Sequence, residues 1–217
     1  IRESYLQNHI AAYRFEFKRI MRRLNKKKID KTEWFCTPQT VNAYCDQIMN
    51  EIVFPAGILK SPFFDVKNPD VMNYGGIGTF IGHELTHFFD DKGSLFDSNG
   101  NLNNWWSKSD KKKFEQKTRI LEKQFNDFEP IKGVKINGQL TSGENISDLG
   151  GVILAYYGYL KSLKNKKELT KKIHGFTNIQ LFFVANAMAE RGHYTESALR
   201  QQLMTDPHSP GKYRVLG

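Results

Sequence analysis

The sequence predicts a predominantly helical α+β fold with one small β-element. Apolar residues recur at helical spacing in several segments, which favours helices over most of the chain. β-prone residues gather in one short stretch, residues 39–54. With 217 residues the chain is long enough for a packed core, and we expect one domain over residues 1–217.

The first segment, residues 4–26, has the spacing of an amphipathic helix, and a Lys-rich loop or linker follows it. Its apolar residues step by three or four positions: Leu6, Ile10, Tyr13, Phe17, Ile20 and Leu24. The chain starts with Ile1-Arg2-Glu3-Ser4, which is no signal peptide and resembles a cut inside a longer protein.

Residues 39–54 contain two candidate strands, one around Ala43 and one at Ile52-Val53-Phe54, and Pro55 ends the second. An exposed strand at Asn42 and Ala43 could pair with an extended peptide through main-chain hydrogen bonds. An ordinary edge strand has the same pattern, and the residues alone favour that simpler interpretation.

Residues 79–90 are expected to form a helix that carries the motif His83-Glu84-Leu85-Thr86-His87. Positions four apart lie on one face of a helix, so His83 and His87 point the same way. Two such imidazoles can share one zinc ion, and Glu84 beside them can act as a general base, an arrangement typical of metal-dependent peptide hydrolases. The pattern also arises by chance in ordinary helices.

An apolar stripe on the same helix predicts which face is buried. Its members recur at helical spacing and leave the two histidines off the stripe: Ile77, Ile81, Leu85 and Phe88. Asp90-Asp91-Lys92-Gly93 follows as an end signal, with Gly93 as the expected C-cap.

A catalytic zinc held by two histidines needs a third protein ligand and one open position. Glu144 is the best candidate, because Thr141 or Ser142 can cap a helix in whose first turn Glu144 would lie. Asp148, four residues on, shares its face and suits a carboxylate that orients a metal-bound histidine. Equally, Glu144 favours any helix N-terminus and Asp148 could simply be solvated.

The expected third-ligand helix spans residues 142–163 and contains Gly150 and Gly151, which suggest close packing against the histidine helix. Three further helices are expected: one from Ser107 to about Phe125, one after a capping box of Thr177 and Gln180, and one over residues 195–204. The run Leu181 to Ala185 is apolar nearly all round, which predicts that it is buried. His208 lies on a loop between Pro207 and Pro210.

The chain carries a net charge of +9, much of it in one segment. A basic stripe can bind nucleic acid or an anionic membrane, but no nucleic-acid module accompanies it, so we expect no nucleic acid as a partner. A solvated helix face, or a surface that meets a missing acidic part of the same protein, explains it more simply. The segment comprises Arg14, Lys18, Arg19, Arg22, Arg23, Lys26, Lys27, Lys28 and Lys31.

Two further features constrain the class of protein. No run of eighteen apolar residues is present, so we expect no membrane span in this chain. Cys36 and Cys45 are the only cysteines, and two cysteines make no disulfide framework, so free thiols are favoured although pairing stays open.

Several stretches together resemble the catalytic region of the neprilysin family of zinc endopeptidases, in that family's order and across nearly the whole chain. Besides the histidine motif they are Val41-Asn42-Ala43-Tyr44, Ile52-Val53-Phe54-Pro55-Ala56-Gly57-Ile58-Leu59, Asn73-Tyr74-Gly75-Gly76-Ile77-Gly78, Gly143-Glu144-Asn145 through Asp148-Leu149-Gly150-Gly151, and His208-Ser209-Pro210.

The resemblance implies a thermolysin-like zincin fold and a role for each matching residue. One zinc ion would be bound by His83, His87 and Glu144, and Glu84 would activate the water. Asp148 would orient a histidine, His208 assisted by Asp206 would stabilise the charged intermediate, and the substrate would contact Asn42, Ala43 and Arg214. Ile58 and Phe63 would line the pocket for a large apolar residue, on whose amino side family members cut oligopeptides.

The resemblance also implies what is missing and where the protein works. The family's large N-terminal helical domain is absent and is the expected partner, so the chain reads as a C-terminal fragment that stops short of the usual end. A tryptophan common after the long apolar helix appears here as Glu190. Bacterial members without disulfides suggest a periplasmic or exported enzyme.

The leading hypothesis is therefore a zinc-dependent endopeptidase that hydrolyses oligopeptides by Glu84-assisted attack of zinc-bound water. A second hypothesis is a zinc-loaded module that holds peptides but turns them over poorly. A third is an anion or nucleic-acid binder built on the basic helix, whose affinity would collapse with salt.

Overall fold

The computed structural model describes residues 4–24 and 30–217, and its contacts divide the chain into two units, 1–34 and 35–217. The first unit holds α1 (Tyr5–Leu24), which matches the expected amphipathic helix except at Ser4, which precedes it, and at residues 25 and 26, which lie outside the described residues. Arg19 and Arg23 each lie 2.6 Å from the Glu33 carboxylate, so part of the basic face is paired within this unit. Lys26, Lys27 and Lys28 also fall outside the described residues. One undivided domain over 1–217 stays a prediction.

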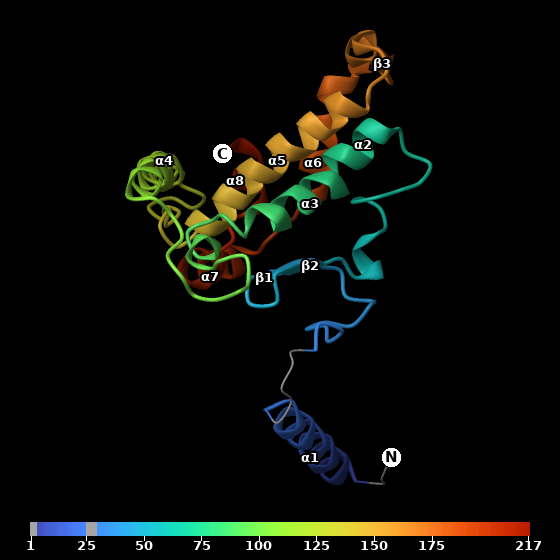
Figure 1. Ribbon diagram of the computed structural model, residues 1–217. Helices are drawn as coiled ribbons and strands as arrows, with labels where there is room; N and C mark the ends of the chain where they lie inside the picture. Colours follow the sequence, from blue (N-terminus) through green and yellow to red (C-terminus); the bar gives the residue numbers. More distant parts are fainter. Residues whose placement is uncertain (1–3, 25–29) are drawn as a thin grey trace. The chain divides into compact units, whose positions relative to one another are not determined.

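The second unit is mostly helical with two small hairpins, which confirms the predicted fold class (Figure 1). The helices are α2 (Asp70–Gly75), α3 (Ile77–Thr86), α4 (Lys108–Asn126), α5 (Ser142–Ser162), α6 (Asn178–Ala189), α7 (Glu196–Thr205) and α8 (Gly211–Leu216), with short 3-10 turns at Ala56–Ile58, Gly93–Leu95 and Lys166–Thr170. The hairpins pair β1 (Tyr44–Asp46) with β2 (Glu51–Val53), and β3 (Lys172–Ile173) with β4 (Phe176–Thr177), both antiparallel. The six-residue helices α2 and α8 were not expected from the sequence.

The β1–β2 hairpin is shorter than the sequence predicted. Tyr44 pairs with Val53 and Asp46 with Glu51, so Asn42 and Ala43 precede the first strand. The Asp46 carboxylate accepts hydrogen bonds from the backbone N–H groups of Ile48 and Met49 in the turn, which ends the strand early. Cys45, within β1, is a free thiol, as is Cys36.

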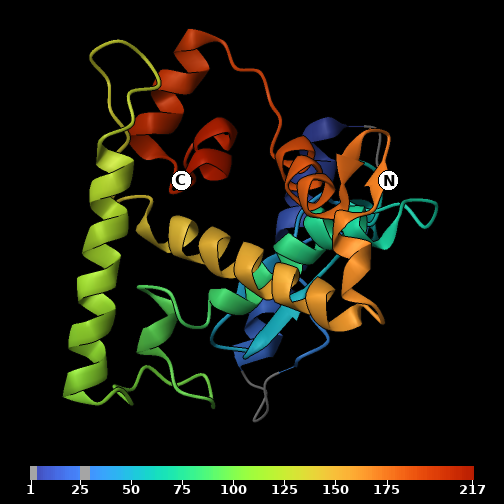
Figure 2. The same cartoon turned by 90° about the horizontal axis from the view of Figure 1, so that it is seen from above.

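Helices α3 and α5 lie side by side in both views and meet through glycines (Figures 1 and 2). A Cβ atom on Gly151 would lie 2.5 Å from the carbonyl oxygen of Thr79, and one on Gly82 would lie 2.7 Å from the carbonyl oxygen of Gly151. Gly150 similarly faces the Thr86 side chain. The predicted close packing of the two helices is therefore confirmed, and it brings the histidine backbone against the third-ligand helix.

The predicted buried stripe of α3 is wrong over most of its length. Ile77 is buried, but Ile81 and Leu85 are 40% and 42% exposed. The glycine-lined contact with α5 turns the opposite side inward and buries His83 and Glu84. Close backbone packing thus overrides the apolar periodicity of this helix.

The core of the second unit lies between α2, α5 and α6. Phe182 is fully buried there, in contact with Val71 and Tyr159. The expected Thr177 capping box starts α6, but Phe183 is 48% exposed, so the apolar run is not buried all round. In the described part of the chain, no helix has the length and apolar character that crossing a membrane requires.

Candidate metal centre

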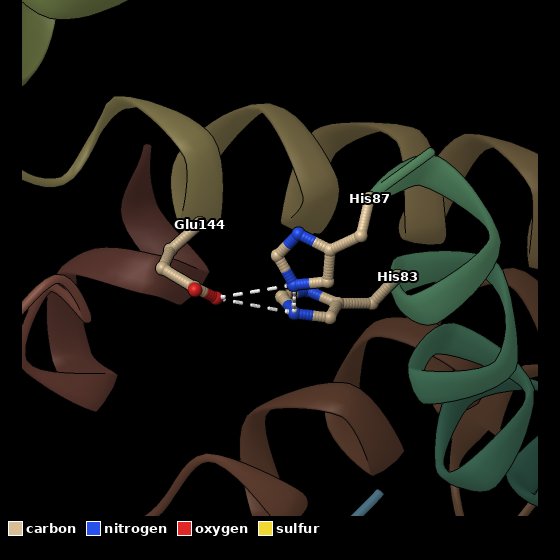
Figure 3. A group of neighbouring side chains, drawn as sticks. All are labelled: His83, His87 and Glu144. Carbon is tan, nitrogen blue, oxygen red and sulfur yellow. Dashed lines mark hydrogen bonds and ion pairs between the residues drawn. The ribbon is translucent and has the colours of Figure 1, made fainter. Parts of the chain in front are cut away.

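Three side chains from two helices converge on one point (Figure 3). His83 comes from α3, and His87, its C-cap residue, keeps helical backbone angles, so the two Nε2 atoms lie 2.9 Å apart. Glu144, in the first turn of α5, places its Oε2 atom 3.2 Å from Nε2 of His83 and 3.5 Å from Nε2 of His87. The predicted ligand set is thus brought together.

These three atoms have the spacing of ligands around zinc. Bonds of about 2.0–2.1 Å in a tetrahedral site separate neighbouring ligand atoms by about 3.3 Å. The three observed separations lie around that value. Oε2 of Glu144 is also buried without a hydrogen-bond donor, as expected of an atom arranged to bind a cation. The residues present therefore fit a zinc ion.

Carboxylates behind the histidines fix the ring orientations. Nδ1 of His83 lies 2.8 Å from Oδ1 of Asp148, and Nδ1 of His87 lies 2.6 Å from Oδ2 of Asp90. A carboxylate accepts, so each Nδ1 carries a proton, and each Nε2 faces the shared point as the atom that can bind a metal once it gives up its own proton. The role of Asp90 was missed from the sequence; its position three residues after His87, on the same side of the helix expected over residues 79–90, is the signal that could have identified it.

The surrounding charges favour positive charge at this point. Burial alone would lower the pKa of His83, but the hydrogen bond to Asp148 and the nearby Glu144 carboxylate raise it to about 9. Burial would likewise lower the pKa of His87, yet Asp90 and Glu144 raise it to about 10. The histidines in turn hold the pKa of Glu144 well below its usual range, against the effect of burial. Carboxylates that hold protons on these rings also favour a metal cation between them.

A cleft of about 410 Å³ opens over the three ligands. Its wall includes Glu84, which is buried beside the histidines and whose pKa is raised by burial although both histidines lower it. A raised pKa suits a general base that works near neutral pH. His208 lies across the cleft, with Nε2 3.2 Å from Oε2 of Glu144 and Nδ1 2.8 Å from Asp206.

The remaining predicted site residues fall into two groups. Asn42, Ala43 and Arg214 line the cleft, as expected of residues that contact substrate. Ile58 and Phe63 do not line it; Ile58 is only 2% exposed, in a core cluster with Ala43 against which Phe63 packs. Their expected role in a substrate pocket stays a prediction.

Arg214, from α8, connects two acidic side chains beside the cleft. It donates hydrogen bonds from Nε and Nη2 to Asp148, and its Nη1 lies 3.4 Å from the Glu190 carboxylate. Glu190 was noted in the sequence only as a departure from the resembled family. Its contact with Arg214 depends on tertiary packing and has no local sequence signal.

The helical fold and the three converging ligand atoms define the class of metallopeptidase-like zinc domains. Consistent with this, the family model described as peptidase family M13 matches residues 42–217. The chain belongs to that family. It is 40% identical over 216 residues to an endothelin-converting enzyme homolog of Locusta migratoria and to neprilysin-3 of Drosophila melanogaster, in each case over 99% of this chain.

Solved structures show the same relationship. The crystal structure of Mycobacterium tuberculosis zinc metalloprotease ZMP1 in complex with an inhibitor is similar with a TM-score of 0.83 and 42% identity. The similarity covers 86% of this chain and 29% of that one. The chain spans 29% and 27% of the length of the two relatives named above.

Proposed function

We propose that the protein containing this chain is a zinc-dependent endopeptidase. The observation that carries the proposal is the convergence of His83, His87 and Glu144, with each histidine backed by a carboxylate. When bound there, zinc lowers the pKa of a coordinated water to about 7 and polarises a peptide carbonyl. The exposed cleft above the ligands offers room for a peptide.

The chain's own residues supply the proton transfers and the positioning. Glu84 takes a proton from the attacking water and passes it to the leaving amine. His208, held by Asp206 at Nδ1, donates a hydrogen bond from Nε2 to the oxyanion that forms. Losing one such donor typically costs about 3–4 kcal/mol of transition-state stabilisation.

Several residues that line the cleft can hold the substrate backbone. Asn42, Ala43 and Arg214 are among them. Asp148 engages only two of the guanidinium nitrogens of Arg214, which leaves N–H groups for a substrate carbonyl on the leaving side. We expect oligopeptide substrates, cut on the amino side of the recognised residue, and an extracytoplasmic location. A preference for large apolar residues is what the family resemblance predicts.

Metal removal tests the proposal directly. The purified full-length protein is analysed for zinc, and cleavage of quenched fluorescent peptides is followed before chelation, after chelation and after zinc is restored. We expect about one zinc per chain and loss of cleavage that zinc reverses. Undiminished cleavage by protein without detectable zinc would show that the proposal is wrong.

A further inference from the structure

A narrow second pocket opens beside the metal centre, behind His83. Phe80 and Val152 give it apolar walls, and Asn186, Glu190 and Arg214 give it polar ones. Its free volume is only about 10 Å³, room for about one water molecule. A substrate side chain that enters this pocket must therefore break some of the contacts between the residues that close the pocket.

The Glu190 carboxylate is the group in this pocket whose charge is least compensated. Its side chain is 12% exposed, and it caps the C-terminal end of α6, where the helix dipole is negative. Burial raises the pKa of Glu190, while the charge of Arg214 lowers it. A carboxylate is costly in both of these settings unless a cation faces it.

Arg214 does not fully provide that cation. Its two short hydrogen bonds, of 2.7 and 2.6 Å, go to Asp148, whereas its contact with Glu190 is 3.4 Å long. Two carboxylates thus share one guanidinium, and the nearer one holds it. Glu190 therefore has the weaker hold on the guanidinium group.

We infer that Glu190 makes this pocket select a basic side chain, lysine or arginine, at the substrate residue that follows the cleaved bond. The inference rests on the proposed function and replaces the preference for large apolar residues. A lysine stem of four methylenes passes between Phe80 and Val152, and its ammonium group reaches Glu190.

The energetics of opening the pocket favour a basic residue over an apolar one. Entry of a substrate side chain breaks the contact between Glu190 and Arg214, which is longer than the two hydrogen bonds between Arg214 and Asp148. A lysine ammonium gives Glu190 a new charged partner, so the lost contact is replaced. A leucine or phenylalanine side chain leaves the carboxylate buried and unpaired.

The test compares peptides that differ only in the residue after the cleaved bond. The zinc-loaded full-length protein is assayed with lysine and with norleucine, which has a stem of the same length without the ammonium group. We expect kcat/KM for the lysine peptide to exceed that for the norleucine peptide about tenfold or more, the effect of one charged hydrogen bond. Arginine should behave like lysine.

Glu190→Gln removes the charge and keeps the shape, and it should bring the lysine-to-norleucine ratio close to one. Glu196→Gln is the matched control, because Glu196 is exposed on α7 and paired with Arg200, and it should leave the ratio unchanged. If the Glu190→Gln protein cleaves peptides too slowly to assay, the two peptides are compared by their binding affinity. Their dissociation constants are then measured on zinc-loaded Glu84→Gln protein with and without Glu190→Gln.

The outcomes separate this inference from the proposed function. The inference is wrong if cleavage is chelator-sensitive but favours norleucine, leucine or phenylalanine, and if Glu190→Gln does not alter the lysine-to-norleucine ratio. That result would still support the proposed endopeptidase activity. Absence of chelator-sensitive cleavage of every peptide overturns the proposed function itself.

Discussion

Asp148 and Arg214 form a two-pronged ion pair that joins the last helix of the chain to the metal centre. Nε of Arg214 lies 2.7 Å from Oδ2 and Nη2 lies 2.6 Å from Oδ1 of Asp148. The same Oδ1 is 2.8 Å from Nδ1 of His83. One carboxylate therefore orients a metal-ligand candidate and a substrate-binding candidate at once.

Replacing Asp148 should affect both partners. Asp148→Asn keeps the size but lets an amide face His83 and Arg214, and we expect zinc affinity to fall about 10–100-fold. It also leaves the buried guanidinium charge less well paired, which costs on the order of 3–5 kcal/mol of stability. Competition with a chromophoric chelator measures the affinity, and denaturant unfolding measures the stability.

Asp90→Asn is the matched comparison, because Asp90 supports His87 and has no contact with Arg214 among those the structure describes. Asp90→Asn should weaken zinc binding to a similar extent but leave the contribution of Arg214 to peptide binding unchanged. Wild-type zinc affinity in both variants would mean that these carboxylates do not orient the ligands.

The Asp148–Arg214 pair should give stability that acid removes. Burial would raise the pKa of Asp148, but the charge and hydrogen bonds of Arg214 lower it to about 2. A carboxyl group with a lowered pKa in the folded state stabilises the protein above its unfolded pKa of about 3.9, and this stability is lost as pH falls towards 2. The shift corresponds to about 2–3 kcal/mol of unfolding free energy at neutral pH.

Urea unfolding of chelator-treated wild type and Asp148→Asn at pH 7, 5, 4 and 3 measures this dependence. The difference in unfolding free energy should be constant from pH 7 to 5 and shrink below pH 4. A difference that persists undiminished at pH 3 would show that the ionised carboxylate is not its source.

Glu84→Gln should separate metal binding from turnover. The amide keeps the shape of Glu84 but accepts no proton, so we expect cleavage to slow by about 10²–10⁴-fold. Zinc content by elemental analysis should match wild type, since no ligand candidate is altered. Glu196→Gln controls for loss of a distant carboxylate, and a Glu84→Gln protein that cleaves peptides at the normal rate would refute the assignment of the base.

Gly151→Ala should loosen the packing that positions His83. The added Cβ would lie 2.5 Å from the carbonyl oxygen of Thr79 and 2.8 Å from the backbone nitrogen of His83, so α3 and α5 must separate. Overpacking of this kind typically costs about 1–3 kcal/mol. We expect a lower melting temperature by calorimetry together with weaker zinc binding.

Gly158→Ala on the same helix is the control for helix propensity. Its added Cβ would meet nothing closer than a Tyr74 ring carbon at 3.4 Å, so the substitution should be neutral or stabilise by up to about 1 kcal/mol. Equal melting temperatures for the two variants would mean that the glycine contact between α3 and α5 does not contribute to stability.

The local features of the site could be predicted because they depend on helical geometry alone. The four-residue spacing of His83 and His87 places them on one face in any helix. Gly150 and Gly151 in an otherwise good helix indicated a close neighbour, and the structure confirms that neighbour as α3. For Glu144, the residues by themselves left ligand and solvated face equally open, and the family resemblance favoured the ligand.

Two predictions about the histidine helix and its end were wrong or incomplete. Apolar periodicity assigned Ile81 and Leu85 to the interior, because it records where apolar side chains lie but not which face packs best. Backbone contact through glycines buried the other face instead. Asp90 was given only the role of a helix-end signal, whereas its carboxylate supports His87.

The sequence by itself determined the helical spacing of the two histidines, the candidate base Glu84 between them and most helix boundaries, since these follow from rules that act over a few residues. Only the tertiary structure decided that Glu190 shares Arg214 with Asp148. The partners of Arg214 lie far apart along the chain, and such contacts depend on how α5, α6 and α8 pack. No local pattern encodes that packing.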